Sequence, residues 1–163
     1  MNYFVGLYNG IAGIASMLAG FGFSSLKMDF PEKTSSIMQI LYLSFTAAAI
    51  GFELCAIINA STCSVFGPGK FLRGRGGVKA AEDVVKVLEE KSEITLQYFY
   101  IGLYCIVISS AFKAFIQYSF LNGLLVTLGL VAITYLLFQA GTRIIASMYV
   151  KKESAISGKI TTE

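Results

Sequence analysis

The sequence predicts an all-α membrane protein: four transmembrane helices, with a cytosolic helical extension between the second and third spans. Three observations lead to this fold class. The chain of 163 residues is 55% hydrophobic but only 14% charged, whereas soluble domains carry roughly a quarter charged residues. Of its 13 basic and 10 acidic residues, 11 lie in the 24 residues from Lys70 to Glu93. Most of the remainder forms neutral stretches close to the ~20 residues that cross a bilayer.

The predicted membrane domain covers residues 1–150 as a single unit. Its four spans are expected at about 3–26, 37–60, 96–119 and 124–150. The first span has no acidic or basic side chain and lacks the basic start of a signal peptide, so we expect a retained helix. The last residues, 151–163, are polar and are expected to form a flexible cytosolic tail.

The connections between the spans carry their own signals. Gly67-Pro68-Gly69 predicts the end of the second helix, and Asn122-Gly123 predicts a tight turn before the fourth. Between them, Val84 and Leu88 recur at a helical spacing opposite a charged face, which predicts an amphipathic helix over residues 78–93. We expect this helix to continue into the third span.

The distribution of lysine and arginine predicts the orientation in the membrane. The connection between the second and third spans has six such residues and the C-terminal tail three, but the first connection has two and the last none. The positive-inside rule therefore places both termini in the cytosol. We expect a multi-pass protein, in the plasma membrane rather than an internal one, with no large extracellular domain.

Composition excludes several classes of function. There is no histidine, and Cys55, Cys63 and Cys105 form no metal-binding or redox pair. No nucleophile with a base and no pair of acids falls at one membrane depth, so we expect neither an enzyme nor a bound cofactor. The net charge of +3 is too small and localised for nucleic acid. The expected partners are membrane lipid and further copies of the chain.

The first span carries a stripe of small and polar residues. Read at alternating steps of four and three, one face holds Asn2, Gly6, Asn9, Gly13, Ser16, Gly20, Ser24 and Lys27. Such a face either allows close helix packing or lines water. Both uses stay open at this point, although the asparagines and serines favour the second.

The end of this helix has two charges of opposite sign. Lys27, Met28 and Asp29 are consecutive, so they point about 100° apart on a helix and only one faces a central axis squarely. A ring of Asp29 carboxylates would favour cations, and a ring of Lys27 would favour anions. The stripe alone favours Lys27.

Glu53 is the only charged residue expected in the second span. An ionised carboxylate is costly inside a bilayer, so we expect Glu53 to be neutral, paired or hydrated. Arg143 in the fourth span is a candidate partner. A structural role and a gating or proton-linked role are both open.

Two short segments resemble the Orai calcium-channel family. Met17-Leu18-Ala19-Gly20-Phe21-Gly22 is similar to that family's Leu-Leu-Ser-Gly-Phe-Ala in its pore helix. Ala56-Ile57-Ile58-Asn59-Ala60-Ser61-Thr62-Cys63 is similar to its Ala-Leu-Met-Ile-Ser-Thr-Cys, with one residue inserted. The family also shares the plan of four spans with both termini inside.

The resemblance implies a homo-oligomer, a hexamer, with six copies of the first helix around one pore. The family's selective glutamate ring falls on Met28, with Asp29 one residue further, which implies a possible Ca²⁺ ring at Asp29. Its hydrophobic gate falls near Phe21 and Ser24, of which only Phe21 is apolar.

Three functions follow as hypotheses. The first is a cation channel, conducting calcium, with its pore formed by the first helix. The second is an anion-selective pore that uses Lys27. The third is a non-conducting structural subunit of a larger membrane complex, in which the glycines serve packing.

Overall fold

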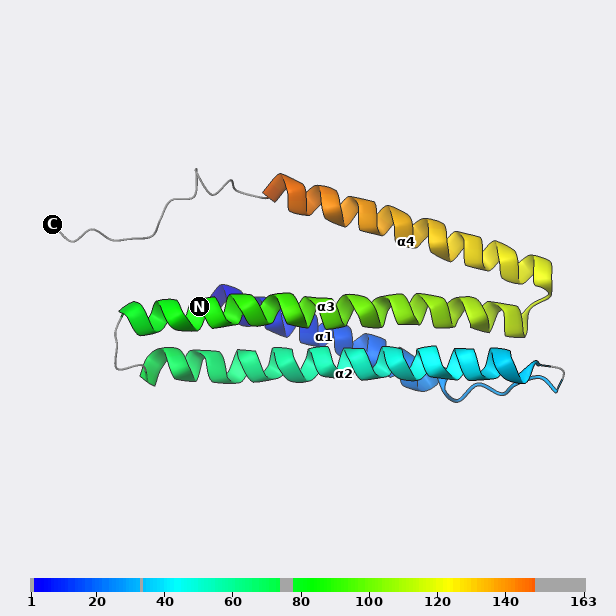
Figure 1. The fold of residues 1–163 in the computed structure, drawn as a ribbon, viewed down its shortest axis with the longest axis horizontal. Coiled ribbons are helices and arrows are strands. Elements are labelled where there is room, and N and C mark those ends of the chain that lie inside the picture. Colours follow the sequence, from blue (N-terminus) through cyan, green and yellow to red (C-terminus); the bar gives the residue numbers. More distant parts are fainter. Residues whose placement is uncertain (1, 33, 74–77, 149–163) are drawn as a thin grey trace. The chain divides into compact units, whose positions relative to one another are not determined.

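The chain folds into four helices and, over the residues described, has no strand. The structure is a computed structural model that describes residues 2–32, 34–73 and 78–148. The helices are α1 (Asn2–Ser25), α2 (Ser36–Arg73), α3 (Val78–Gln117) and α4 (Phe120–Met148) (Figure 1). Each contains a segment long and apolar enough to cross a membrane. This confirms the prediction of an all-helical protein with four helices able to cross a membrane, whereas the cytosolic extension, the type of membrane and the orientation stay predictions.

Two compact units divide the chain, and their boundary falls inside α4. The first covers Met1–Thr127 and the second Leu128–Glu163. The first unit therefore holds α1, α2, α3 and the start of α4. The single domain expected over residues 1–150 stays a prediction. The expected tail at 151–163 and the glycine-rich turn at 74–77 lie outside the described residues.

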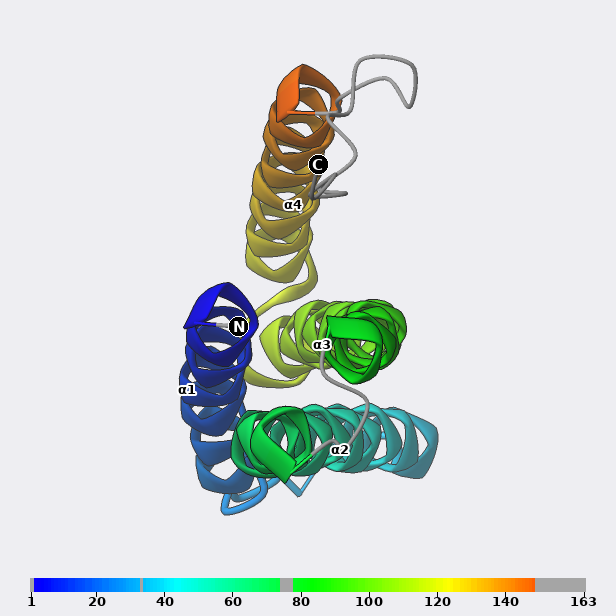
Figure 2. The same cartoon turned by 90° about the vertical axis from the view of Figure 1, so that its left-hand side faces the viewer.

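In the first unit, α2 packs against both α1 and α3, while α1 and α3 share a smaller interface. Helices α2 and α3 run antiparallel side by side, and α1 crosses them obliquely (Figures 1 and 2). The loop over residues 26–35 joins α1 to α2 at one end of the unit. The N-terminal end of α1 points toward the opposite end, where α2 finishes and α3 begins.

Buried residues on α2 and α3 recur at steps of three and four. On α2 they include Tyr42, Thr46, Ala49, Glu53, Ala56 and Ala60, and on α3 they include Leu88, Ser92, Thr95, Gly102 and Ser109. This 3.5-residue period is that of paired coiled-coil helices. Most of these side chains are small or polar, and small residues let membrane helices approach closely. We call this set the α2–α3 seam.

The amphipathic helix predicted at residues 78–93 is confirmed as the first part of a continuous α3. Val84 and Leu88 are buried in one apolar cluster with Tyr8 of α1 and Ala60 of α2. The charged residues with described side chains in this segment are all exposed: Glu82, Asp83, Lys86, Glu89, Glu90, Lys91 and Glu93.

The helix end predicted at Gly67-Pro68-Gly69 is wrong, because α2 continues through Pro68 to Arg73. Proline removes one backbone donor and crowds the carbonyl four residues earlier, but its fixed φ is compatible with a helix. Gly67 is buried seven residues after Ala60, in phase with the α2–α3 seam. The helix is thus buried beside the position where Pro68 lacks a backbone donor.

The tight turn predicted at Asn122-Gly123 is also wrong, because α4 already begins at Phe120. The actual connection is Tyr118 and Ser119, and the Gly123 amide donates the first helical bond to the Ser119 carbonyl at 2.9 Å. A Cβ on Gly123 would lie 2.9 Å from the Phe115 ring. Glycine is thus needed here for close packing within the first unit rather than for a turn.

Candidate functional site

Within the first unit, the small and polar stripe of α1 lies on the side of the helix that faces away from α2 and α3. The buried face of α1 consists of Tyr8, Ile11, Ala15, Ala19 and Gly22. The stripe residues with described side chains are all exposed: Gly6, Asn9, Gly13, Ser16, Gly20 and Ser24. A Cβ placed on Gly6, Gly13 or Gly20 would have no atom of α2 or α3 within 4 Å. The glycines of the stripe therefore do not serve packing within the first unit.

The contact between α1 and α2 depends on a different glycine. A Cβ on Gly22 would lie 2.6 Å from Cγ1 of Ile50. The two helices approach closely at this point because Gly22 has no side chain. Gly22 belongs to the motif that resembles the Orai family, but its function here is helix packing.

Two polar side chains of the stripe already have partners in the chain. Ser16 donates a hydrogen bond of 2.7 Å from its hydroxyl group to the Ala12 carbonyl one turn earlier. The Ser64 hydroxyl group donates to Oδ1 of Asn9 at 2.8 Å, which ties the edge of the stripe to α2. Phe21 is 62% exposed and lies beside Gly20 on the same open side of α1.

The charged residues after α1 do not belong to the helix. The helix ends at Ser25, and the Lys27 amide makes a three-residue bond to the Ser24 carbonyl at 3.3 Å, which closes the last turn. The extension of the stripe to Lys27 assumed a helix to that residue and is wrong. Lys27 and Asp29 are exposed and Met28 is half-buried in the loop. Helix geometry therefore does not determine whether Lys27 or Asp29 faces a central axis.

A calcium site within one chain is not assembled at Asp29. Among the described residues, no three histidine, cysteine, aspartate or glutamate side chains come close enough to hold a metal ion. Ca²⁺ takes about 6–8 oxygen ligands. A calcium site at Asp29 would therefore need carboxylates from several copies of the chain.

Glu53 is completely buried on α2, in the α2–α3 seam. Neither of its carboxyl oxygens has a hydrogen-bond partner among the described residues. Its Oε1 lies where a side chain of residue 102 would be, since a Cβ on Gly102 would be only 2.6 Å away. Arg143, the partner considered from the sequence, is exposed and belongs to the second unit, so that pairing stays a prediction.

Three buried or half-buried hydrogen bonds between helices were not expected from the sequence. Tyr8 donates from its hydroxyl group to the Leu88 carbonyl at 2.6 Å, and Tyr42 donates to the Ser25 carbonyl at 2.7 Å. The hydroxyl groups of Thr46 and Ser109 lie 2.5 Å apart across the α2–α3 seam. The period of small residues in the second span was the signal that could have located this seam.

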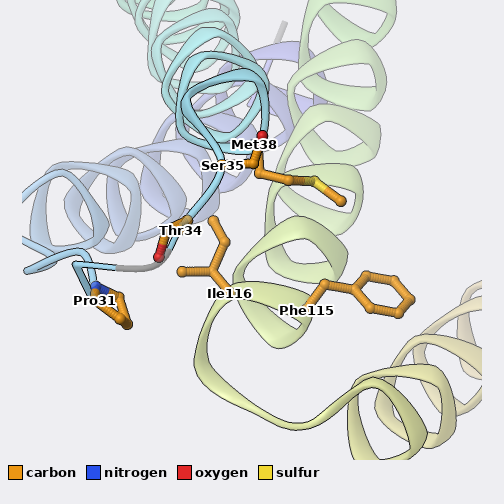
Figure 3. A pocket seen from close by; sticks show the side chains of 6 residues that line it. All are labelled: Pro31, Thr34, Ser35, Met38, Phe115 and Ile116. Atoms are coloured by element: carbon orange, nitrogen blue, oxygen red, sulfur yellow. The ribbon is translucent and has the colours of Figure 1, made fainter.

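A pocket of about 230 Å³ lies beside the loop that follows α1. It is lined by Pro31, Thr34, Ser35, Met38, Phe115 and Ile116 (Figure 3). The side chain of Ile116 points toward Pro31 and Thr34, so the end of α3 meets the loop here. None of the lining residues is charged, and we assign the pocket no role in ion binding.

Comparison with known protein families, curated proteins and solved structures found no match. The resemblance to the Orai family therefore depends on the two sequence motifs and the four-span plan.

Proposed function

We propose that the chain is a subunit of an oligomeric ion channel whose pore is lined by α1 and conducts cations, including calcium. The observation that carries this proposal is the exposed stripe from Gly6 to Ser24. It lies opposite the face that α1 uses to pack on α2 and α3. The first unit thus leaves this small and polar face largely exposed.

In a bilayer, this polar face of α1 must be shielded from the lipid hydrocarbon. Polar groups that face hydrocarbon are unfavourable, and helices in membranes hide them against other helices or around water. Several copies with α1 at the centre would satisfy this by turning the stripe toward a shared axis. In that arrangement α2 and α3 lie outside α1 and meet the lipid, which suits their exposed apolar residues such as Ile40, Ile58 and Ile101.

Selectivity in this proposal comes from the loop after α1. Asp29 is exposed just beyond the helix end, so symmetric copies bring several carboxylates to one mouth of the pore. A ring of carboxylates attracts cations and supplies oxygen ligands to calcium. Lys27 is exposed in the same loop and would favour anions if it faced the axis instead.

One observation favours a second candidate, the non-conducting structural subunit. Ser16 and Asn9 have hydrogen-bond partners within the chain, so part of the stripe is satisfied without water. The exposed glycines would then pack against a helix of another protein or copy. In the channel the stripe contacts water, whereas in the structural subunit it packs against another helix.

Cysteine accessibility tests the pore directly. In a chain without its native cysteines, Ser16→Cys lies on the stripe, and Ile14→Cys lies on a different exposed part of α1 and is the matched control. With purified protein in planar bilayers, a charged thiol reagent should block current through the first variant but not the second. Equal block of both, or no current from the parent protein, contradicts the proposal.

Substitution of the loop charges identifies the ion. Asp29→Asn should shift the reversal potential away from that of calcium, while Lys27→Gln should leave calcium permeation intact or raise it. The opposite result assigns the pore to anions. A chain that is monomeric in mild detergent and in bilayers would contradict both forms of the pore.

A further inference from the structure

We infer that Glu53 is a proton-binding site inside the membrane, a carboxylic acid kept neutral in the α2–α3 seam and closed over by Gly102. This inference does not depend on the channel proposed above, because it concerns only the packing of one chain. It selects the neutral state among the three that the sequence left open for Glu53.

The depth of Glu53 makes its charge state important. The apolar segment of α2 covers Ser36–Lys70, and Glu53 is its middle residue. The side chain has no exposed surface, and both oxygens lack a hydrogen-bond partner among the described residues. A carboxylate without water, donor or cation is one of the costliest groups to bury, so the carboxyl group must be compensated or protonated.

Along the described helices of the first unit, no basic residue lies near the level of Glu53. The described helix α1 contains no acidic or basic side chain, and the apolar segment of α2 has no other until Lys70 at its end. On α3, the basic residues nearest to Gly102 are Lys91 on one side and Lys113 on the other. Each is eleven residues of helix away from Gly102, about 16 Å along the axis.

The remaining titratable groups at this level supply no charge either. Tyr98 and Cys105 flank Gly102 on α3 at a distance of about one turn, and both side chains are normally uncharged at neutral pH. On α1, the titratable groups are Tyr3 and Tyr8, which lie toward its N-terminal end. Because the described residues of the first unit supply no nearby positive charge, Glu53 is expected to be neutralised by a proton.

The close contact with Gly102 explains how the site stays closed. A Cβ on Gly102 would lie 2.6 Å from Oε1, 2.9 Å from Cδ and 3.1 Å from Cγ of Glu53. The carboxyl group thus takes up the volume that any larger residue at 102 would need. The Thr46–Ser109 pair lies seven residues away on each helix and fixes the same register, so α2 and α3 hold the carboxyl group between them.

Infrared spectroscopy of the full chain in lipid bilayers tests the protonation state without needing access by a reagent. At neutral pH, wild-type protein should show the carbonyl band of a protonated carboxylic acid. The band should move on labelling with ¹³C-glutamate and should be lost in Glu53→Gln. It should persist in Asp29→Asn, the control for an exposed acid, and in Arg143→Gln.

A wild-type spectrum without this band overturns the inference, because Glu53 is then ionised. If the band appears only in Arg143→Gln, the carboxylate is paired with that arginine. If Glu53→Gln does not fold, the ¹³C shift of the wild-type band still decides, because it assigns the band to a glutamate, and Glu53 is the buried glutamate among the described residues.

A double substitution tests the placement of the carboxyl group. Gly102→Ala should lower the thermal unfolding midpoint of the wild type markedly, since the new Cβ collides with Glu53. In a Glu53→Ala background, where that space is empty, the same change should lower the midpoint by much less. An equal decrease in both backgrounds would mean that Glu53 does not lie against Gly102.

Discussion

The hydroxyl group of Tyr8, on α1, is hydrogen-bonded to the backbone carbonyl of Leu88, on α3, at 2.6 Å. Both side chains are buried, and they belong to the apolar cluster that also holds Val84 and Ala60. Because α1 and α3 share only a small interface, this bond is one of the few specific links between them. It joins the predicted pore helix to the part of α3 that carries the charged face.

Removal of this hydroxyl group should weaken that link. We expect Tyr8→Phe to lower the free energy of unfolding by about 1 kcal/mol, the net value of a typical buried hydrogen bond. Tyr3 is 74% exposed, so Tyr3→Phe is the matched control and should have no measurable effect. Unfolding in mixed detergent micelles measures both, and equal losses would argue against a specific role for the Tyr8 bond.

The two kinds of glycine on α1 should respond differently to alanine. Gly22→Ala places a methyl group against Ile50 and should destabilise the chain by about 1–3 kcal/mol, as overpacking of a core does. Gly20→Ala meets no neighbour in the first unit and should leave the stability of the single chain unchanged. Its effect should appear instead in the oligomer, measured by crosslinking. A stable Gly22→Ala chain would contradict the close contact of α1 and α2.

The Thr46–Ser109 hydrogen bond should couple α2 to α3. In a double-mutant cycle with Thr46→Val and Ser109→Ala, we expect a coupling energy of about 0.6 kcal/mol, the average measured for hydrogen bonds between membrane helices. The double variant should cost little more than either single one, because it leaves no unsatisfied hydroxyl group. Additive effects of the two substitutions would show that the bond does not contribute.

The orientation in the membrane can be checked with two exposed positions. Glu32 lies in the loop after α1, and Lys86 lies near the start of α3 at the other end of the first unit. Cysteines at these positions should label from opposite sides of intact cells or vesicles, with Lys86 on the cytosolic side. Labelling of both from the same side would contradict the four-span topology.

Patterns of charge and hydrophobic spacing over a whole helix predicted more of this fold than single glycine and proline residues did. Absence of charge located the four helices, and the spacing of Val84 and Leu88 located the amphipathic start of α3. Pro68 and Gly123 misled, because their effect depends on neighbours that the local sequence does not show. Gly67 is buried in phase with the α2–α3 seam, Gly123 lies against Phe115, and both sites are helical.

The candidate site was predictable in outline only. The periodic stripe on α1 was visible in the sequence, but which side of α1 packs on α2 was not. The position of the helix end at Ser25 decided that Lys27 and Asp29 are loop residues, and hydropathy does not fix a boundary to one residue. The position of Glu53 within the second helix was expected, whereas its complete burial and its contact with Gly102 depend on the register between two helices.

The lengths of α2 and α3 have a mechanical consequence. Helices of 38 and 40 residues extend about 57–60 Å at 1.5 Å per residue, roughly twice the ~30 Å hydrocarbon thickness of a bilayer. The two helices pair along the α2–α3 seam. Each is continuous from the level of Glu53 to the end of the pair where the charged part of α3 begins, so the pair is stiff. A tilt or rotation applied at that charged end would be carried to Glu53 and on to the far end of the pair.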